Sequence, residues 1–195
     1  RVMAEALGAT TARRARNGVE IPMGALLRGK PRDVFIALTL PPGRPGEQLK
    51  LALTLHGRDA ATGAAMAPLA AHARLTFAEA RENTDQPRDA DLSLGAAGAW
   101  MGQILRVMAQ LNAREPAAAR EYAETQSRYF HRYVEGLPGG AELLEQMALL
   151  RARATREWDA RLRKEMHYLA QRNFNSVEDF RGPDKESWAE RLRRS

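Results

Sequence analysis

The sequence predicts an α+β protein, in which a small antiparallel β domain is followed by an antiparallel helical bundle. Two periodicities support this fold class. Before residue 82, apolar residues recur at every second position, and after residue 88 they recur every three or four positions. A polar segment, 82–87, separates the two patterns and ends in a proline. We therefore expect a β domain over residues 1–82 and a helical domain over residues 88–195.

The clearest strand pattern covers residues 32–56. Residues 32–40 and 48–56 both alternate apolar with polar side chains, which is typical of strands that bury one face. The loop 41–47 between them contains three prolines and is too long for a two-residue turn, so we expect a wide hairpin. Its apolar face requires a cover. A second sheet, as in a sandwich, the helical domain, or a missing segment supplied by a partner would each provide one.

The remaining β elements are shorter. Residues 1–8 suit either a short helix or an edge strand, and the sequence leaves both open. Residues 19–23 predict a short strand, which Pro22 places at a sheet edge. A turn is expected over residues 57–63, and residues 71–77 then alternate as a third clear strand.

The helical domain is predicted to contain three main helices and a short C-terminal helix. The first covers about residues 91–111, and the second begins near Pro116, a residue favoured in a first helical turn. The third carries the longest apolar stripe, from residue 143 to residue 169. A last short helix is expected at residues 188–194. Short loops between the main helices predict antiparallel packing.

Composition excludes several classes of protein. The chain has 195 residues, of which 44% are hydrophobic and 28% charged, and no apolar run approaches the roughly 20 residues of a membrane helix. The absence of cysteine excludes disulfides and cysteine-based zinc sites or nucleophiles. We expect a cytoplasmic protein that does not contact a membrane, and the alanine and arginine content suggests a bacterial origin. Because the chain begins with Arg1, it would suit a piece of a longer protein.

Arginine produces most of the net charge of +6. The cationic residues gather near the start of the chain and on the late helical stripe. Acidic residues interrupt the second cluster, so a solvated helix face explains it better than a phosphate-binding stripe does. As candidate interaction residues the sequence offers Arg13, Arg14, Arg16, Arg156, Arg163 and Lys164.

One motif has the spacing of a phosphate-binding loop. Gly24 and the pair Gly29-Lys30 match the required positions, but Pro31 stands where such a loop needs Ser or Thr to bind magnesium. The segment also leads into a strand instead of the helix whose N-terminus would hold the phosphates. We interpret it as the turn that leads into the strand at residues 32–40.

No catalytic or metal-binding constellation emerges from the other residues. The four histidines show no metal-binding spacing, although His56 and His72 could be cross-strand neighbours, which leaves a weaker hydrolase hypothesis. The aromatic group at residues 122–133 would suit base stacking, but at helical spacing it more often fills a core or a helix–sheet seam. We therefore expect a protein that is not an enzyme and binds no cofactor or metal.

The order of turns and strands between Ile21 and Gly63 resembles the β-sandwich segment that follows the A domain in bacterial von Willebrand factor A domain proteins. In that family a short strand leads through a glycine turn to a long strand that ends in proline, and a helical region follows. The resemblance covers roughly residues 19 to 172. The matching motifs are Ile21-Pro22-Met23-Gly24, Gly29-Lys30-x-Arg32-Asp33, the strand ending at Pro41, Arg58-Asp59-x-x-Thr62-Gly63 and Arg163-Lys164-Glu165-Met166-x-Tyr168.

The resemblance implies a non-enzymatic scaffold that supports or displays a metal-binding A domain within a larger assembly. The implied partners are a von Willebrand factor A domain, in the same or another chain, and a MoxR-type AAA+ ATPase. The family's metal site lies in the A domain, which this chain lacks. Asp91 and Ser93 match part of that Asp-x-Ser-x-Ser site, but its last serine is missing, and a helix N-cap explains them better. The alternative function is nucleic-acid binding through the arginine-rich segments.

Overall fold

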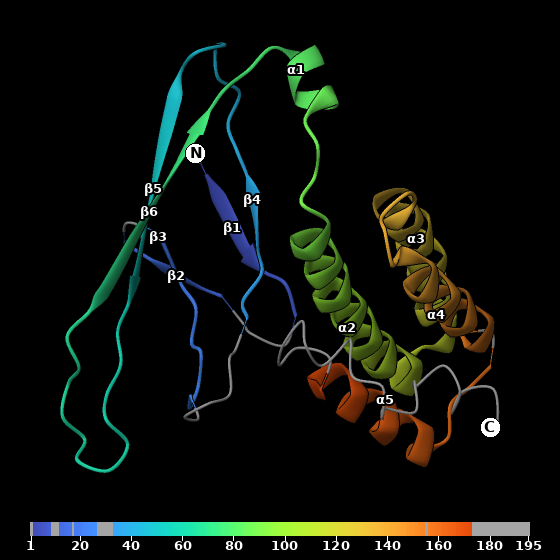
Figure 1. Cartoon of the computed structure of the whole chain (residues 1–195). Coiled ribbons are helices and arrows are strands. Elements are labelled where there is room, and N and C mark those ends of the chain that lie inside the picture. Colours follow the sequence, from blue (N-terminus) through green and yellow to red (C-terminus); the bar gives the residue numbers. More distant parts are fainter. Residues whose placement is uncertain (1, 9–11, 17, 27–32, 155, 173–195) are drawn as a thin grey trace. The chain divides into compact units, whose positions relative to one another are not determined.

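The computed structural model describes residues 2–8, 12–16, 18–26, 33–154 and 156–172 (Figure 1). It confirms the α+β class, because small antiparallel sheets are followed by helices. In the described part of the chain, six strands form three separate two-stranded sheets. None of the described helices is both long enough and apolar enough to cross a membrane.

The strand pairing differs from the predicted hairpin. β4 (Ile36–Thr39) pairs with β1 (Met3–Ala6), whereas β5 (Gln48–Leu55) pairs with β6 (Leu69–Thr76). The hairpin predicted between residues 32–40 and 48–56 is therefore wrong. β5 and β6 match apolar to apolar positions along eight residues each, which gives a much longer ladder than the four residues of β4 allow.

The shorter strands settle two further expectations. Residues 3–6 form a strand, so the strand alternative for the start of the chain is confirmed. The strand expected at residues 19–23 is shorter and begins one residue earlier, as β3 (Gly18–Glu20), which pairs with β2 (Arg13–Ala15). It ends before Pro22, which has no N–H to donate to a ladder. The expected strand at 71–77 is confirmed as β6. Most of the expected turn at residues 24–30 lies outside the described residues.

A short helix replaces part of the expected linker. α1 (Ala80–Asp85) begins where the Glu82 carboxylate accepts a hydrogen bond from the backbone N–H of Glu79, at 3.3 Å. α2 (Ala90–Arg114) then follows, and its first turn is capped by Asp89, whose side chain accepts from the N–H of Leu92 at 2.8 Å. The predicted cap at Asp91 or Ser93 is wrong, since both residues already lie inside the helix.

The third predicted helix is two helices. After α3 (Pro116–Val134), whose start at Pro116 was expected, α4 (Gly140–Arg153) ends and α5 (Ala160–Arg172) begins, so the continuous helix predicted over 143–169 is wrong. The described part of the chain therefore has four helices after α1 instead of three. The short helix expected at residues 188–194 lies outside the described residues.

Asn112 of α2 accounts for the break between α4 and α5. Its side chain is 1% exposed. Its carbonyl oxygen accepts from the backbone N–H of Trp158 at 2.8 Å, and its amide donates to the carbonyl of Arg156 at 3.1 Å. These bonds satisfy backbone groups that a helix would otherwise pair, and Asp159 caps the new helix by accepting from the N–H of Leu162 at 2.7 Å.

The main hydrophobic core lies among the helices. α2 packs against α3, α4 and α5, and α3 packs against α4. Phe130 is fully buried, which confirms the core interpretation for this member of the aromatic group. Tyr133 is half-buried, and its ring meets that of Trp100 edge to face with centroids 5.9 Å apart. For Tyr129 the core interpretation is wrong, because this residue is 57% exposed. The largest fully buried side chains are Phe130, Met101, Ile104, Leu105, Met108, Leu150, Met166, Val134 and Asn112.

The chain divides into two compact units. One unit consists of residues 40–87, with the β5–β6 hairpin and α1. The other joins the described residues of 2–39 with those that follow residue 87, and it contains the helical core. The domain limits 1–82 and 88–195 stay a prediction.

Candidate functional site

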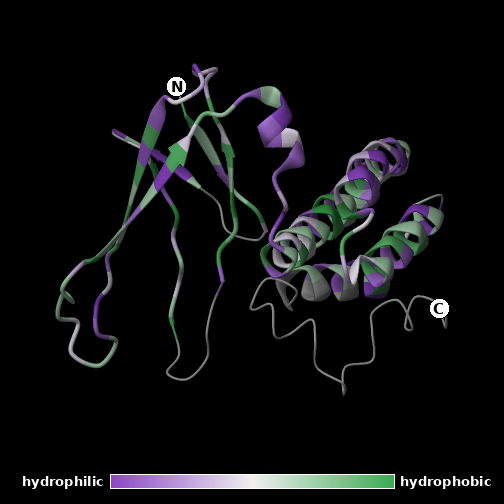
Figure 2. Cartoon of the chain, turned by 45° about the horizontal axis from the view of Figure 1, so that its top comes forward, coloured by the Kyte–Doolittle hydropathy of each residue, from purple (hydrophilic) through white to green (hydrophobic). Residues whose placement is uncertain are grey.

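The β5–β6 hairpin has one apolar face. The register pairs Leu49 with Leu75 at one end and Leu55 with Leu69 at the other, and residues that lie opposite each other on two strands share a face. In Figure 2, hydrophobic and hydrophilic bands alternate along these two strands. We call this side the leucine face. Its members are Leu49, Leu51, Leu53, Leu55, Leu69, Ala71, Ala73 and Leu75.

The leucine face is exposed along much of its length. Leu53 is 46%, Leu55 42% and Leu69 68% exposed, and Met66, close to the start of β6, is 61% exposed. Isolated apolar side chains are common on protein surfaces, but a contiguous row of them is typical of an interaction site. Because the sequence predicts this face to be covered, its exposure makes the hairpin the first candidate functional site.

The opposite face of the hairpin is cationic. Lys50 and Arg74 are direct cross-strand partners, and neither strand contains an acidic residue. Like charges in this position destabilise a strand pair. His72, two residues before Arg74, lies opposite Ala52, whereas His56 follows the end of β5. The expectation that the two histidines are cross-strand neighbours is therefore wrong.

The connection between β5 and β6 contains a tight turn within residues 57–63, where a turn was predicted. The Asp59 carboxylate accepts from the backbone N–H of Ala61 at 3.0 Å and of Thr62 at 2.7 Å, and from the Thr62 hydroxyl at 2.9 Å. Arg58 donates to the carbonyl of Gly63 at 3.2 Å. These hydrogen bonds lower the pKa of Asp59 below its ordinary value of 3.8. The backbone N–H of Thr62 contributes most to the shift, followed by the Thr62 hydroxyl and the backbone N–H of Ala61.

This geometry predicts how the turn responds to pH. A lowered pKa in the folded hairpin stabilises the turn above pH 3.8, and this stabilisation is lost as the pH falls through the folded-state pKa. The amide resonances of Ala61 and Thr62, followed by NMR from pH 6 to pH 2, should shift with a midpoint below 3.8. In an Asp59→Asn variant this titration should vanish. A midpoint at or above the ordinary value would contradict the hydrogen-bonded turn.

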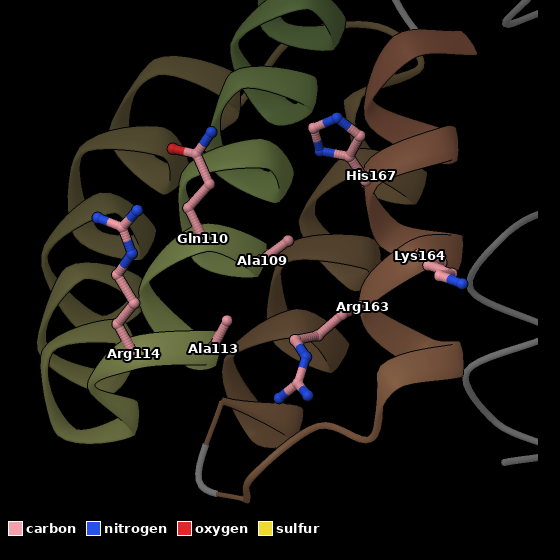
Figure 3. Close-up of a pocket in the computed structure, with 7 residues that line it drawn as sticks. All are labelled: Ala109, Gln110, Ala113, Arg114, Arg163, Lys164 and His167. Atoms are coloured by element: carbon pink, nitrogen blue, oxygen red, sulfur yellow. The ribbon is translucent and has the colours of Figure 1, made fainter.

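A second candidate site is a groove between α2 and α5, with a volume of about 620 Å³ (Figure 3). Ala109 and Ala113 project from α2 toward α5, and their short side chains leave the space open. Arg163 and His167 project from α5 toward α2, whereas Lys164 points away. Gln110 and Arg114 complete the described lining, in which no residue is acidic. This cationic groove is suited to an anionic group.

The structure brings only two of the predicted interaction residues into one site. Arg163 and Lys164 both line the cationic groove. Arg156 precedes α5, and Arg13 and Arg14 lie on β2, with Arg16 directly after it; all four are exposed. The groove also contains three residues that were not among the predicted interaction residues, Gln110, Arg114 and His167. The i, i+4 spacing of Gln110 and Arg114 places them on one side of α2, but nothing in the sequence pairs α2 with α5.

Other polar clusters have local roles. His131 lies 3.7 Å from the carboxylate of Glu135, one helical turn further on. Burial raises the pKa of Tyr122, and the nearby charge of Arg106 opposes this shift only in part. Within the described ranges, no three His, Asp or Glu side chains are close enough to hold a metal ion.

Comparison with known proteins identifies no relative. No family model matches the chain, and no significant match exists among curated proteins or solved structures. The two candidate sites therefore rest on their own geometry.

Proposed function

We propose that this chain is a non-enzymatic protein-interaction and scaffolding module, and that the leucine face of the β5–β6 hairpin is its contact surface. The exposure of Leu53, Leu55 and Leu69 on one face carries this proposal. A two-stranded hairpin is marginally stable alone, and covering its apolar face stabilises it. A partner that packs on this face would therefore stabilise the hairpin as it binds.

Capture from an extract of the source organism tests this proposal. The tagged full chain is crosslinked, purified and sized by light scattering, with tag alone as the control. We expect a discrete complex of defined mass, because covering an apolar face of this kind favours association. A monomer without partner over a range of salt and protein concentrations would contradict the proposal.

We further propose that the partner is a metal-binding von Willebrand factor A domain, carried in the same or another chain, in an assembly with a MoxR-type AAA+ ATPase in the bacterial cytoplasm. This part rests on the resemblance of the strand and turn order. Mixing the purified chain with recombinant A domains tests it by size-exclusion chromatography. Co-elution that depends on Leu53 and Leu69 is the expected result, and separate elution of all A domains would refute this assignment.

The cationic groove favours a second function, nucleic-acid binding. Arg114 and Arg163 offer two phosphate contacts. The affinity for a labelled duplex should then fall with a log–log salt slope of about −2. Fluorescence anisotropy between low and physiological salt measures this slope. Arg163→Gln should weaken binding, with exposed Arg132 on α3 as the matched control for the same substitution. No binding at low salt would exclude this function.

A further inference from the structure

We propose that the free edge of β6 binds an extended segment of a partner protein in which apolar and acidic side chains alternate. This inference rests on the proposed function and specifies the chemistry of the partner. The segment would add a third strand to the β5–β6 hairpin. Its apolar side chains would extend the leucine face, and its acidic side chains would lie on the cationic face.

The β6 edge is open to such a strand. In the described part of the chain β6 pairs with β5 alone, so its other edge presents unpaired backbone N–H and C=O groups. Every residue of β6 except Leu75 is exposed, whereas β5 has two half-buried residues, Leu49 and Leu51. An added strand supplies main-chain hydrogen bonds at this edge and brings a marginal two-stranded hairpin to three strands.

The charges of the hairpin select the side chains of that strand. On the cationic face, Lys50 and Arg74 lie directly opposite each other, with His72 two residues along β6. No acidic side chain of the described residues forms an ion pair with Lys50 or Arg74. A carboxylate placed beside Arg74 would relieve this like-charge repulsion. A second carboxylate, two residues away on the added strand, would lie beside His72.

The same charges disfavour a second copy of this chain as the occupant. Pairing two β6 edges would gather two copies of Lys50 and two of Arg74 on one small surface, without a carboxylate on any of the four strands. Cationic side chains at sheet edges oppose this kind of self-association. The geometry therefore favours a different, acidic partner strand.

Synthetic peptides test the inference on the full chain. The probe is a dye-labelled, end-blocked nonapeptide of alternating Val and Glu, and its binding is followed by fluorescence anisotropy. A Val/Lys peptide tests the charge preference. A Val/Glu peptide N-methylated at every residue keeps all side chains and charges but loses the N–H donors of both edges. We expect the Val/Glu peptide to bind at least about tenfold more tightly than either control.

Charge variants of the hairpin make the test specific. The double substitution Lys50→Glu and Arg74→Glu should invert the preference toward the Val/Lys peptide. The neutral pair Lys50→Gln and Arg74→Gln should remove the preference without inverting it, and circular dichroism verifies that each variant folds. Failure of the Val/Glu peptide to bind, equal binding of the Val/Glu and Val/Lys peptides, or binding that survives N-methylation would each overturn the inference. If partner capture still depends on Leu53 and Leu69 in that case, the proposed function stands without it.

Discussion

Replacing Asn112 by alanine is expected to lower the free energy of unfolding by about 3 kcal/mol, through lost hydrogen bonds and a new cavity in the core. The substitution leaves the backbone N–H of Trp158 and the carbonyl of Arg156 without their partner. Both groups belong to the break between α4 and α5, where no helical bond replaces the lost ones. Urea denaturation followed by circular dichroism at 222 nm measures the effect.

Two substitutions serve as controls for this prediction. Gln110 lies two residues before Asn112 on α2, carries the same amide group on a side chain one methylene longer, and is exposed. Gln110→Ala should therefore change the free energy of unfolding by less than about 0.5 kcal/mol. Asn112→Asp keeps an acceptor for the N–H of Trp158 and, while its carboxyl is protonated, a donor for the carbonyl of Arg156. The loss of stability should therefore grow as the buried carboxyl ionises and this donor disappears. Equal stability of the Asn112→Ala and Gln110→Ala variants would contradict the assigned role of Asn112.

Substituting both Leu53 and Leu69 by serine is expected to weaken the complex with the captured partner by about 100-fold. Each leucine that a partner covers contributes about 1.5 kcal/mol or more, and 1.4 kcal/mol corresponds to tenfold in affinity. Both side chains are exposed in the chain alone, so the substitutions remove little packing from the hairpin itself. Surface plasmon resonance with the purified partner measures the change in the dissociation constant.

The matched control places the same serines on the opposite face. Ala52→Ser and Ala70→Ser lie on β5 and β6, each one position away from the substituted leucines, and both are exposed. This pair should leave the affinity within about threefold of the original, since a small hydroxyl on a solvated face changes little. Comparable losses in the two double variants would show that the leucine face is not the contact surface.

The sequence predicted the faces of the strands better than their partners. Alternation of Leu49 to Leu55 correctly indicated an amphipathic strand, because side-chain direction follows from a local period of two. Pairing depends on which strands offer the longest matching ladder, and residues 41–47 separate two strands that were expected to meet. The ladder instead forms between β5 and β6. Backbone hydrogen bonds from Gly46 to Phe77 and from Phe77 to Glu47 extend it beyond the start of β5.

The helix break lay beyond local sequence signals. The apolar spacing continues through Ala154, Trp158 and Leu162, and no glycine or proline occurs between residues 141 and 172. The cause is a buried amide on α2, which is more than 40 residues away in sequence. Only Asp159, a favoured N-cap residue, marked the new helix start in the sequence.

The candidate sites also depend on tertiary packing that local sequence patterns do not reveal. The composition of the leucine face is readable from the sequence, but its exposure is a property of the folded chain. Arg163 and Lys164 were singled out because they lie in a cationic run. Arg114 could not be joined to them, since α2 and α5 meet only through tertiary packing.

Hydrogen exchange of the chain alone and in its purified complex tests the central claim most directly. The amides of residues 48–76 belong to an exposed two-stranded hairpin and should exchange quickly in the free chain, whereas those of α2 in the helical core should exchange slowly. On complex formation, protection should rise across residues 48–55 and 69–76. Unchanged exchange in this hairpin, with new protection at other residues, would contradict its role as the contact surface.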